Sequence, residues 1–226
     1  MLEIYRRFAN TKWFDLAAAS PLIVFYLFAT AGMIIKAIPE LRGLAAHLDA
    51  SHVLSIVSQV ATLTFLDVQI VLFVIRYVPR ARAAGFLPRA SAVIGANIQG
   101  SFLLLPHAEH GTPVNIVSLV LIIVGTAASA YVASCLGRSF SVLPQARSLR
   151  MSGPYRFVRH PLYLAEQIAM LGLMVQFAAP WCVLVAAVSF AAQFPRMHFE
   201  EEVLKATFPA YRDYMKRTAR LIPGIY

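Results

Sequence analysis

The sequence has little charge and few of the residues that mark common enzyme classes. Only 14% of its 226 residues are charged, compared with about 25% in an ordinary soluble domain. Its two cysteines give neither a metal-ligand spacing nor a disulfide framework. It contains no Walker loop, no dinucleotide-binding glycine fingerprint and no HExxH motif. These absences argue against a soluble globule, a disulfide scaffold and the common nucleotide-binding and zinc enzymes.

The sequence consists largely of long apolar runs, and 59% of its residues are hydrophobic. The last run has about 34 residues, too many for one membrane span of about 20, and Pro180 with its small neighbours predicts a turn within it. We therefore expect an all-α integral membrane protein with about six transmembrane helices, the last two forming a helical hairpin. The runs occupy residues 16–35, 53–75, 90–105, 114–136 and 162–195.

The predicted helices divide the basic residues unevenly between the two sides of the membrane. Negative charge is scarce, with 11 Asp and Glu against 20 Lys and Arg. In a six-helix topology every basic residue, including Arg6 and Arg7 in the N-terminal tail, falls on one side except Lys36 and Arg42. The positive-inside rule then predicts that both termini face the cytoplasm. Because the surplus charge follows topology and forms no continuous groove, we expect a lipid bilayer and no nucleic acid as partner.

The first polar motif precedes the hairpin and reads GPYRFVRHPLY at 153–163. Pro161 suits the first position of a helix, where its missing N–H costs nothing. His160 would then stand at the helix start and Tyr163 one turn inside. Nearby arginines would attract an anion, although basic residues also flank membrane spans for topological reasons alone.

The second polar motif follows the hairpin and reads RMHFEEE at 196–202. Helical spacing puts Arg196 and Glu200 on one face, although such a pair is also a common surface feature. Apolar residues then recur at helical spacing, which predicts an amphipathic C-terminal helix on the membrane surface. Pro209 is expected to divide that helix.

Together these motifs, the hairpin between them and a closing LIP resemble the isoprenylcysteine carboxyl methyltransferase family. Its wider group includes membrane phospholipid methyltransferases. The resemblance covers about 137–226, so we expect a methyltransferase catalytic region there and four N-terminal membrane helices in 1–136. Three positions depart from the family pattern: Ala165 and Pro209 where glycine is common, and Glu166 where an apolar or aromatic residue is usual.

The resemblance implies an enzyme that binds S-adenosylmethionine near the cytoplasmic face and needs no metal. It links Arg196 to the acceptor carboxylate and Glu200 to the cosubstrate. We expect Arg196, Glu200 and Glu201 to be catalytic, and Arg196 and Glu166 to bind the acceptor. The residues that it implies for the cosubstrate are Arg147, Ser148, Leu149, Arg150, Tyr155, His160, Pro161, Leu162, Tyr163 and Glu200.

The acceptor decides what else the chemistry requires. A carboxylate is ionised at neutral pH and needs only an orienting cation, a role that suits Arg196. An ammonium or thiol acceptor must lose a proton, and Glu166, Glu201 or His198 would serve as its base. A lipid-like or prenylated carboxylate is favoured. Phospholipid N-methylation and small-thiol S-methylation stay open, as does the oligomeric state.

A non-enzymatic alternative is a small membrane transporter. Asp67 lies within a predicted span, where a charge is costly and marks either a functional site or a polar contact between helices. Asn97 and Gln99 add polarity to the third run. No inverted repeat, which many transporters have, is visible.

Overall fold

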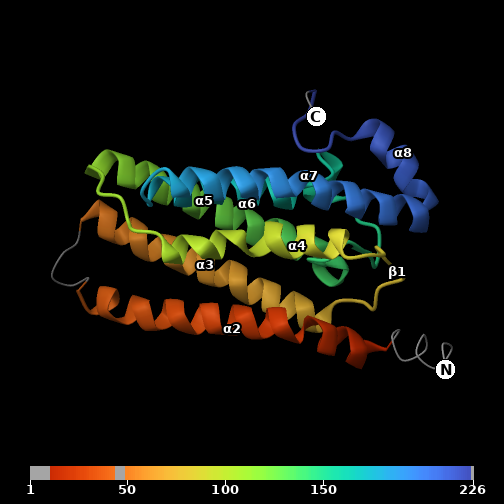
Figure 1. The fold of residues 1–226 in the computed structure, drawn as a ribbon, viewed down its shortest axis with the longest axis horizontal. Coiled ribbons are helices and arrows are strands. Elements are labelled where there is room, and N and C mark those ends of the chain that lie inside the picture. The colour runs from red at the N-terminus through yellow and green to blue at the C-terminus, as the bar shows by residue number, and fades with distance from the viewer. Residues whose placement is uncertain (1–10, 44–48, 225–226) are drawn as a thin grey trace.

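The computed structural model describes residues 11–43 and 49–224, and within them the chain is mostly helical (Figure 1). Arg6, Arg7 and the last two residues of the predicted catalytic region lie outside these ranges. The main helices are α2 (Lys12–Gly43), α3 (Ala50–Ile75), α4 (Leu87–Asn97), α5 (Thr112–Leu136), α6 (Pro161–Val175), α7 (Trp181–Thr207) and α8 (Pro209–Arg217). The 3₁₀ turns are η1 (Ile98–Leu104), η2 (Gly137–Ser139) and η3 (Gly153–Arg156), and two short strands, β1 (Ala81–Arg82) and β2 (Gln145–Ala146), complete the described chain.

The predicted all-α membrane fold is confirmed. Four helical segments are long and apolar enough to cross a bilayer: Lys12–Pro39, Ala50–Ile75, Thr112–Ser139 and Trp181–Thr207. Helices α4 and α6 account for the other two predicted spans, but both are short. At 1.5 Å per residue, α6 reaches about 22 Å, less than the roughly 30 Å hydrocarbon core.

The helical hairpin is present, formed by α6 and α7. Its turn contains a cis peptide bond between Ala179 and Pro180. Helix α7 continues through Pro195 to Thr207, so the second polar motif belongs to the same helix as the second limb of the hairpin. Helix α8 begins at Pro209, as expected of a residue that lacks the N–H needed to continue a helix.

Helix α5 packs closely against α6 because small residues face each other. A Cβ atom added to Gly125 would lie 2.2 Å from the backbone nitrogen of Ala169. Further along, Ser118 Oγ donates a hydrogen bond to the Gly172 carbonyl at 2.8 Å. Helix α5 also packs on α3, α3 on α2, α6 on α7, and α7 on α4. The helices therefore follow the spatial order α2, α3, α5, α6, α7, α4.

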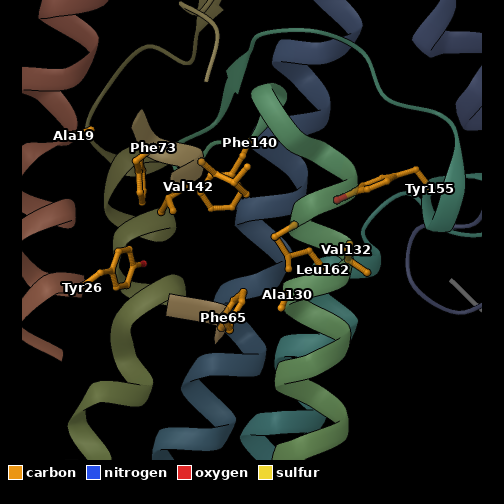
Figure 2. Close-up of a cluster of buried hydrophobic side chains, with 12 residues drawn as sticks. Ala19, Tyr26, Phe65, Phe73, Ala130, Val132, Phe140, Val142, Tyr155 and Leu162 are labelled. Carbon is orange, nitrogen blue, oxygen red and sulfur yellow. The ribbon is translucent and has the colours of Figure 1, made fainter. Parts of the chain in front are cut away.

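Aromatic side chains fill the interior between these helices (Figure 2). The rings of Phe73 and Phe140 meet edge to face at 5.4 Å between centroids. Tyr26 of α2 stacks on Phe73 at 6.0 Å. The interior therefore joins α2 and α3 to the loop that follows α5.

One end of the bundle, at which α2 and α6 begin and α3 and α7 end, carries most of the arginines; we call it the basic end (right in Figure 1). Strands β1 and β2 pair there in antiparallel register, with Ala81 opposite Ala146. This ribbon joins the α3–α4 connection to the loop after α5. The candidate site lies at the same end.

Candidate active site

The first polar motif enters α6 as predicted, with Pro161 as the first helical residue and His160 directly before it. The backbone N–H of His160 donates to the Arg220 carbonyl at 3.1 Å, and that of Arg159 to the Ala219 carbonyl at 2.8 Å. The C-terminal tail therefore pairs with the motif and fixes its path.

Glu200 is the partly open carboxylate of the site. The Tyr163 hydroxyl donates to Glu200 Oε2 at 2.7 Å, and His160 Nδ1 lies 3.9 Å from the same oxygen. The His160 and Tyr163 rings stack with centroids 5.2 Å apart. The Glu200 side chain is still 33% exposed. A carboxylate beside aromatic rings is suited to a cationic ligand.

Tyr155 also belongs to this neighbourhood and is buried. Burial, with the nearby charge of Glu200 as the next cause, raises the pKa of Tyr155 well above its ordinary value. Its phenol therefore stays protonated at neutral pH and can donate a hydrogen bond. The Tyr214 hydroxyl donates to the Tyr155 carbonyl, which anchors this turn to α8.

The neighbouring carboxylate, Glu201, lies in a different environment and is only 2% exposed. Its Oε1 accepts from Arg159 Nε at 2.9 Å and lies 3.1 Å from His160 Nε2. Its Oε2 accepts from Arg220 Nη2 at 2.6 Å. Glu201 thus links the first motif, α7 and the C-terminal tail in one buried ionic network.

Arg196 lies one helical turn before Glu200 and is buried, with 3% of its side chain exposed. Its guanidinium lies over the ring of Tyr163, with Cζ 4.3 Å from the centroid. Nη1 donates to Gln193 Oε1 at 2.9 Å and more weakly to Glu166 Oε2 at 3.5 Å. Tyr163 therefore contacts both Arg196 and Glu200.

Helix α4 makes room for Arg196 by presenting a glycine. A Cβ atom at Gly95 would lie 2.6 Å from Arg196 Cδ and 3.2 Å from the Cβ of Ala192. Any larger residue would have to displace the arginine or the helix. Gly95 thus sets the position of Arg196 without touching the polar atoms of the site.

Two donors in this buried group have no hydrogen-bond partner among the residues that the structure describes: Arg196 Nε and Gln193 Nε2. Buried polar groups are nearly always satisfied, and an unsatisfied one costs about 1–3 kcal/mol. Two neighbouring orphan donors suit an oxygen-bearing ligand group. Gln193 and Gly95 are site residues that sequence reasoning missed. Gln193 carried a visible signal, since an amide at i−3 from Arg196 shares its helix face.

Two of the cosubstrate residues implied for 147–150, Arg147 and Ser148, form their hydrogen bonds with residues other than Glu200. Arg147 is buried and donates to Asp15 of α2, with Nη2 2.9 Å from Oδ1 and Nη1 3.1 Å from Oδ2. Ser148 shares a hydrogen bond with Ser139, and Arg150 is exposed. By contrast, Tyr155, His160, Tyr163 and Glu200 do come together, with Pro161 and Leu162 buried between them in the chain.

The remaining polar candidates lie apart. Asp67 is exposed on α3, and His198 is exposed on α7. The Asn97 amide donates to the Val93 carbonyl, one turn back in its own helix. These residues form no polar path through the described part of the bundle.

The sequence of the region that forms this site also matches a known protein family. Residues 113–210 match the family described as Phospholipid methyltransferase. The matched region runs from α5 into α8, so it contains the hairpin and both polar motifs. The region that holds both polar motifs is thus similar to membrane methyltransferases. The matched family is one of the isoprenylcysteine carboxyl methyltransferase-like group of membrane methyltransferases.

Two curated relatives are similar over a shorter stretch. The cobalt-zinc-cadmium resistance protein CzcN of Cupriavidus metallidurans is 33% identical over 79 residues, which are 34% of this chain and 37% of that one. The nickel-cobalt-cadmium resistance protein NccN of Alcaligenes xylosoxydans xylosoxydans is 29% identical over 82 residues, 36% of this chain and 38% of the relative. The chain thus spans little more than a third of the length of these relatives.

Proposed function

We propose that this protein is an integral membrane methyltransferase that uses S-adenosylmethionine and methylates a lipid-like or prenylated carboxylate. The observation that carries the proposal is the double contact of Tyr163. Its hydroxyl donates a hydrogen bond at 2.7 Å to Glu200, whose side chain is partly exposed. Its ring centroid lies 4.3 Å from Cζ of the buried Arg196. A position suited to a cation and a position suited to an anion are therefore adjacent.

The residues around Glu200 fit the cosubstrate. When bound, S-adenosylmethionine supplies a methyl group on a positively charged sulfur with a good leaving group. The Glu200 carboxylate would hold its α-amino group. The rings of Tyr155 and Tyr163 would favour its positive charge, and His160 at the start of α6 would meet its carboxylate.

The residues around Arg196 fit an acceptor carboxylate. Glu166 and Gln193 occupy Nη1, whereas Arg196 Nε and Gln193 Nε2 keep no partner among the described residues. Those two donors would orient the acceptor oxygens. Methyl transfer to a carboxylate forms a C–O bond and breaks a C–S bond without moving a proton, so no base is needed. The task of the chain is then positioning and exclusion of water.

Glu166 favours one alternative, an amine acceptor such as that of a phospholipid headgroup. Its side chain lies beside Arg196 and within the same buried group. An amine needs a base, and Glu166 would accept its proton. The two acceptors give different products, because a methyl ester releases methanol in alkali and a methylated amine does not.

The decisive experiment begins with titration of the purified protein with S-adenosylmethionine and S-adenosylhomocysteine. We expect both to bind. Incubation with methyl-labelled cosubstrate and membrane lipid extracts should then give a labelled lipid, and alkali treatment identifies an ester. Well-folded protein that binds neither ligand would refute the proposal.

We further propose that the basic end faces the cytoplasm, in accord with the positive-inside rule. Arg150 is exposed at that end. In intact cells, an Arg150→Cys variant should resist a membrane-impermeant maleimide and react only after permeabilisation. Both native cysteines should be replaced by alanine in the labelling background.

The names of the two relatives suggest a physiological setting. Both are named for resistance to metals that include cobalt and cadmium, and we propose that the methylated product contributes to such resistance. A strain that lacks the protein should grow poorly on cobalt or cadmium. The wild-type chain should restore growth, whereas an Arg196→Ala variant should not.

A further inference from the structure

A cavity lies at the basic end, and neither Glu200 nor Arg196 lines it. It has a volume of about 330 Å³ and is lined by α2, α3, α4, β1 and the loop at 142–145. Its inner walls are apolar, with Ala18, Ala19 and Leu22 on α2 and Phe73 on α3. Since α2 packs on α3 and α4 packs on α7, the cavity lies between the two ends of the helix order.

The rim of this cavity is cationic. Arg76, Arg82 and Arg89 all line it, and Asp15 is the only carboxylate among its lining residues within 11–43 and 49–224. Asp15 is already engaged, because Arg76 Nε lies 2.8 Å from Oδ2 and Arg147 Nη2 lies 2.9 Å from Oδ1. Burial, followed by the charge of Arg147, lowers the pKa of Arg76 to about 10. Among the described lining residues, arginines therefore outnumber carboxylates three to one.

Arg89 contributes to this excess of positive charge. It is exposed near the start of α4 and lines the cavity. Within 11–43 and 49–224 no carboxylate forms an ion pair with it. Arg82 extends over the ring of Phe14, with Cζ 5.5 Å from the centroid, which holds its guanidinium on the α2 side of the rim.

The position of the cavity along the helices sets its depth in a bilayer. Asp15 lies in the first turn of α2, Arg76 caps the end of α3, and Arg89 lies in the first turn of α4. For membrane-spanning helices this is the depth of the lipid headgroups. Leu22 lies seven residues beyond Asp15, about 10 Å deeper along α2, where the acyl chains begin.

We propose that this cavity binds an anionic phospholipid of the leaflet at the basic end. The headgroup phosphate lies between Arg82 and Arg89, and the upper acyl chains lie against Ala18, Ala19 and Leu22. Arg76 adds a further positive charge to the lining while it remains paired with Asp15. This lipid is a bound neighbour of the bundle, and the proposal does not depend on the methyl-transfer function.

Native mass spectrometry of the purified full chain, titrated with phosphatidylglycerol and separately with phosphatidylcholine, tests the proposal. We expect one phosphatidylglycerol to bind tightly and phosphatidylcholine to bind weakly. The double variant Arg82→Gln/Arg89→Gln should weaken phosphatidylglycerol binding about 30-fold, because each arginine near an anionic lipid contributes about 1 kcal/mol. The matched control is Arg212→Gln/Arg217→Gln, which removes two exposed charges from α8 and should leave binding within about twofold.

A second pair of variants tests the apolar wall without changing charge. Ala18→Phe should fill the cavity and reduce phosphatidylglycerol binding, whereas Ala17→Phe, on the neighbouring exposed residue that does not line the cavity, should not. Equal losses in both double arginine variants would reduce the effect to overall charge and overturn the proposal. Unchanged binding in Ala18→Phe and in Arg82→Gln/Arg89→Gln would overturn it as well.

Discussion

The guanidinium of Arg196 lies over the ring of Tyr163, with Cζ 4.3 Å from the ring centroid. The hydroxyl of the same tyrosine donates to Glu200 Oε2 at 2.7 Å. One side chain therefore touches the two charged groups of opposite sign in the site. The hydroxyl and the ring of Tyr163 can be changed by separate substitutions, so the roles of Glu200 and Arg196 can be distinguished.

Tyr163→Phe keeps the ring under Arg196 and removes the hydrogen bond to Glu200. A hydrogen bond to a charged group contributes about 1.5–3 kcal/mol. We expect S-adenosylhomocysteine to bind about tenfold or more weakly, with little change in KM for the acceptor. Calorimetric titration and steady-state kinetics measure the two effects. A raised acceptor KM with normal cosubstrate affinity would reverse the proposed roles of Glu200 and Arg196.

Gln193→Leu should act on the acceptor side alone. It removes the 2.9 Å partner of Arg196 Nη1 and one of the two orphan donors. We expect acceptor KM to rise about tenfold while the cosubstrate Kd stays unchanged. Gln167→Leu is the matched control, since that amide lies on the same hairpin but bonds Ser189 at 3.3 Å. If the control impairs the acceptor step equally, Gln193 has no special part.

Gly95→Ala should disturb Arg196 from a neighbouring helix. The added methyl group would lie 2.6 Å from Arg196 Cδ, a distance that forces a shift. We expect kcat/KM for the acceptor to fall about tenfold or more, because small misplacements of a positioning group are costly. Gly32→Ala on α2 is the control, as nothing lies within 4 Å of its added atom. Full activity of Gly95→Ala would show that Arg196 tolerates displacement.

Glu201→Gln should destabilise the protein more than it affects catalysis directly. The change leaves Arg159 and Arg220 without their buried counter-charge, and breaking a buried ion pair typically costs about 3–5 kcal/mol. We expect a melting temperature lower by about 10 °C in a thermal shift assay. Glu202→Gln alters the next residue, which pairs with Lys205 at the surface, and should melt like the wild type. Normal stability with lost activity would instead favour the catalytic role first expected of Glu201.

The sequence predicted the helices well because long apolar runs and prolines act locally. The start of α6 at Pro161, the turn at Pro180 and the break before Pro209 all follow from the missing N–H of proline. The neighbours of the arginines were not predictable in this way. Arg147 meets Asp15, 132 positions away, and Arg196 meets Gly95 on another helix. Such pairings depend on how the helices pack, which residue spacing within one segment does not encode.

The bond between Arg147 and Asp15 also bears on how such a protein can change over evolution. The region shared with the phospholipid methyltransferase family begins at α5, whereas Asp15 and Arg76 belong to helices that precede it. A recombination that exchanged α2 for an unrelated helix would leave the buried Arg76 and Arg147 without the carboxylate of Asp15. Any exchange of α2 would therefore have to preserve a carboxylate at the position of Asp15.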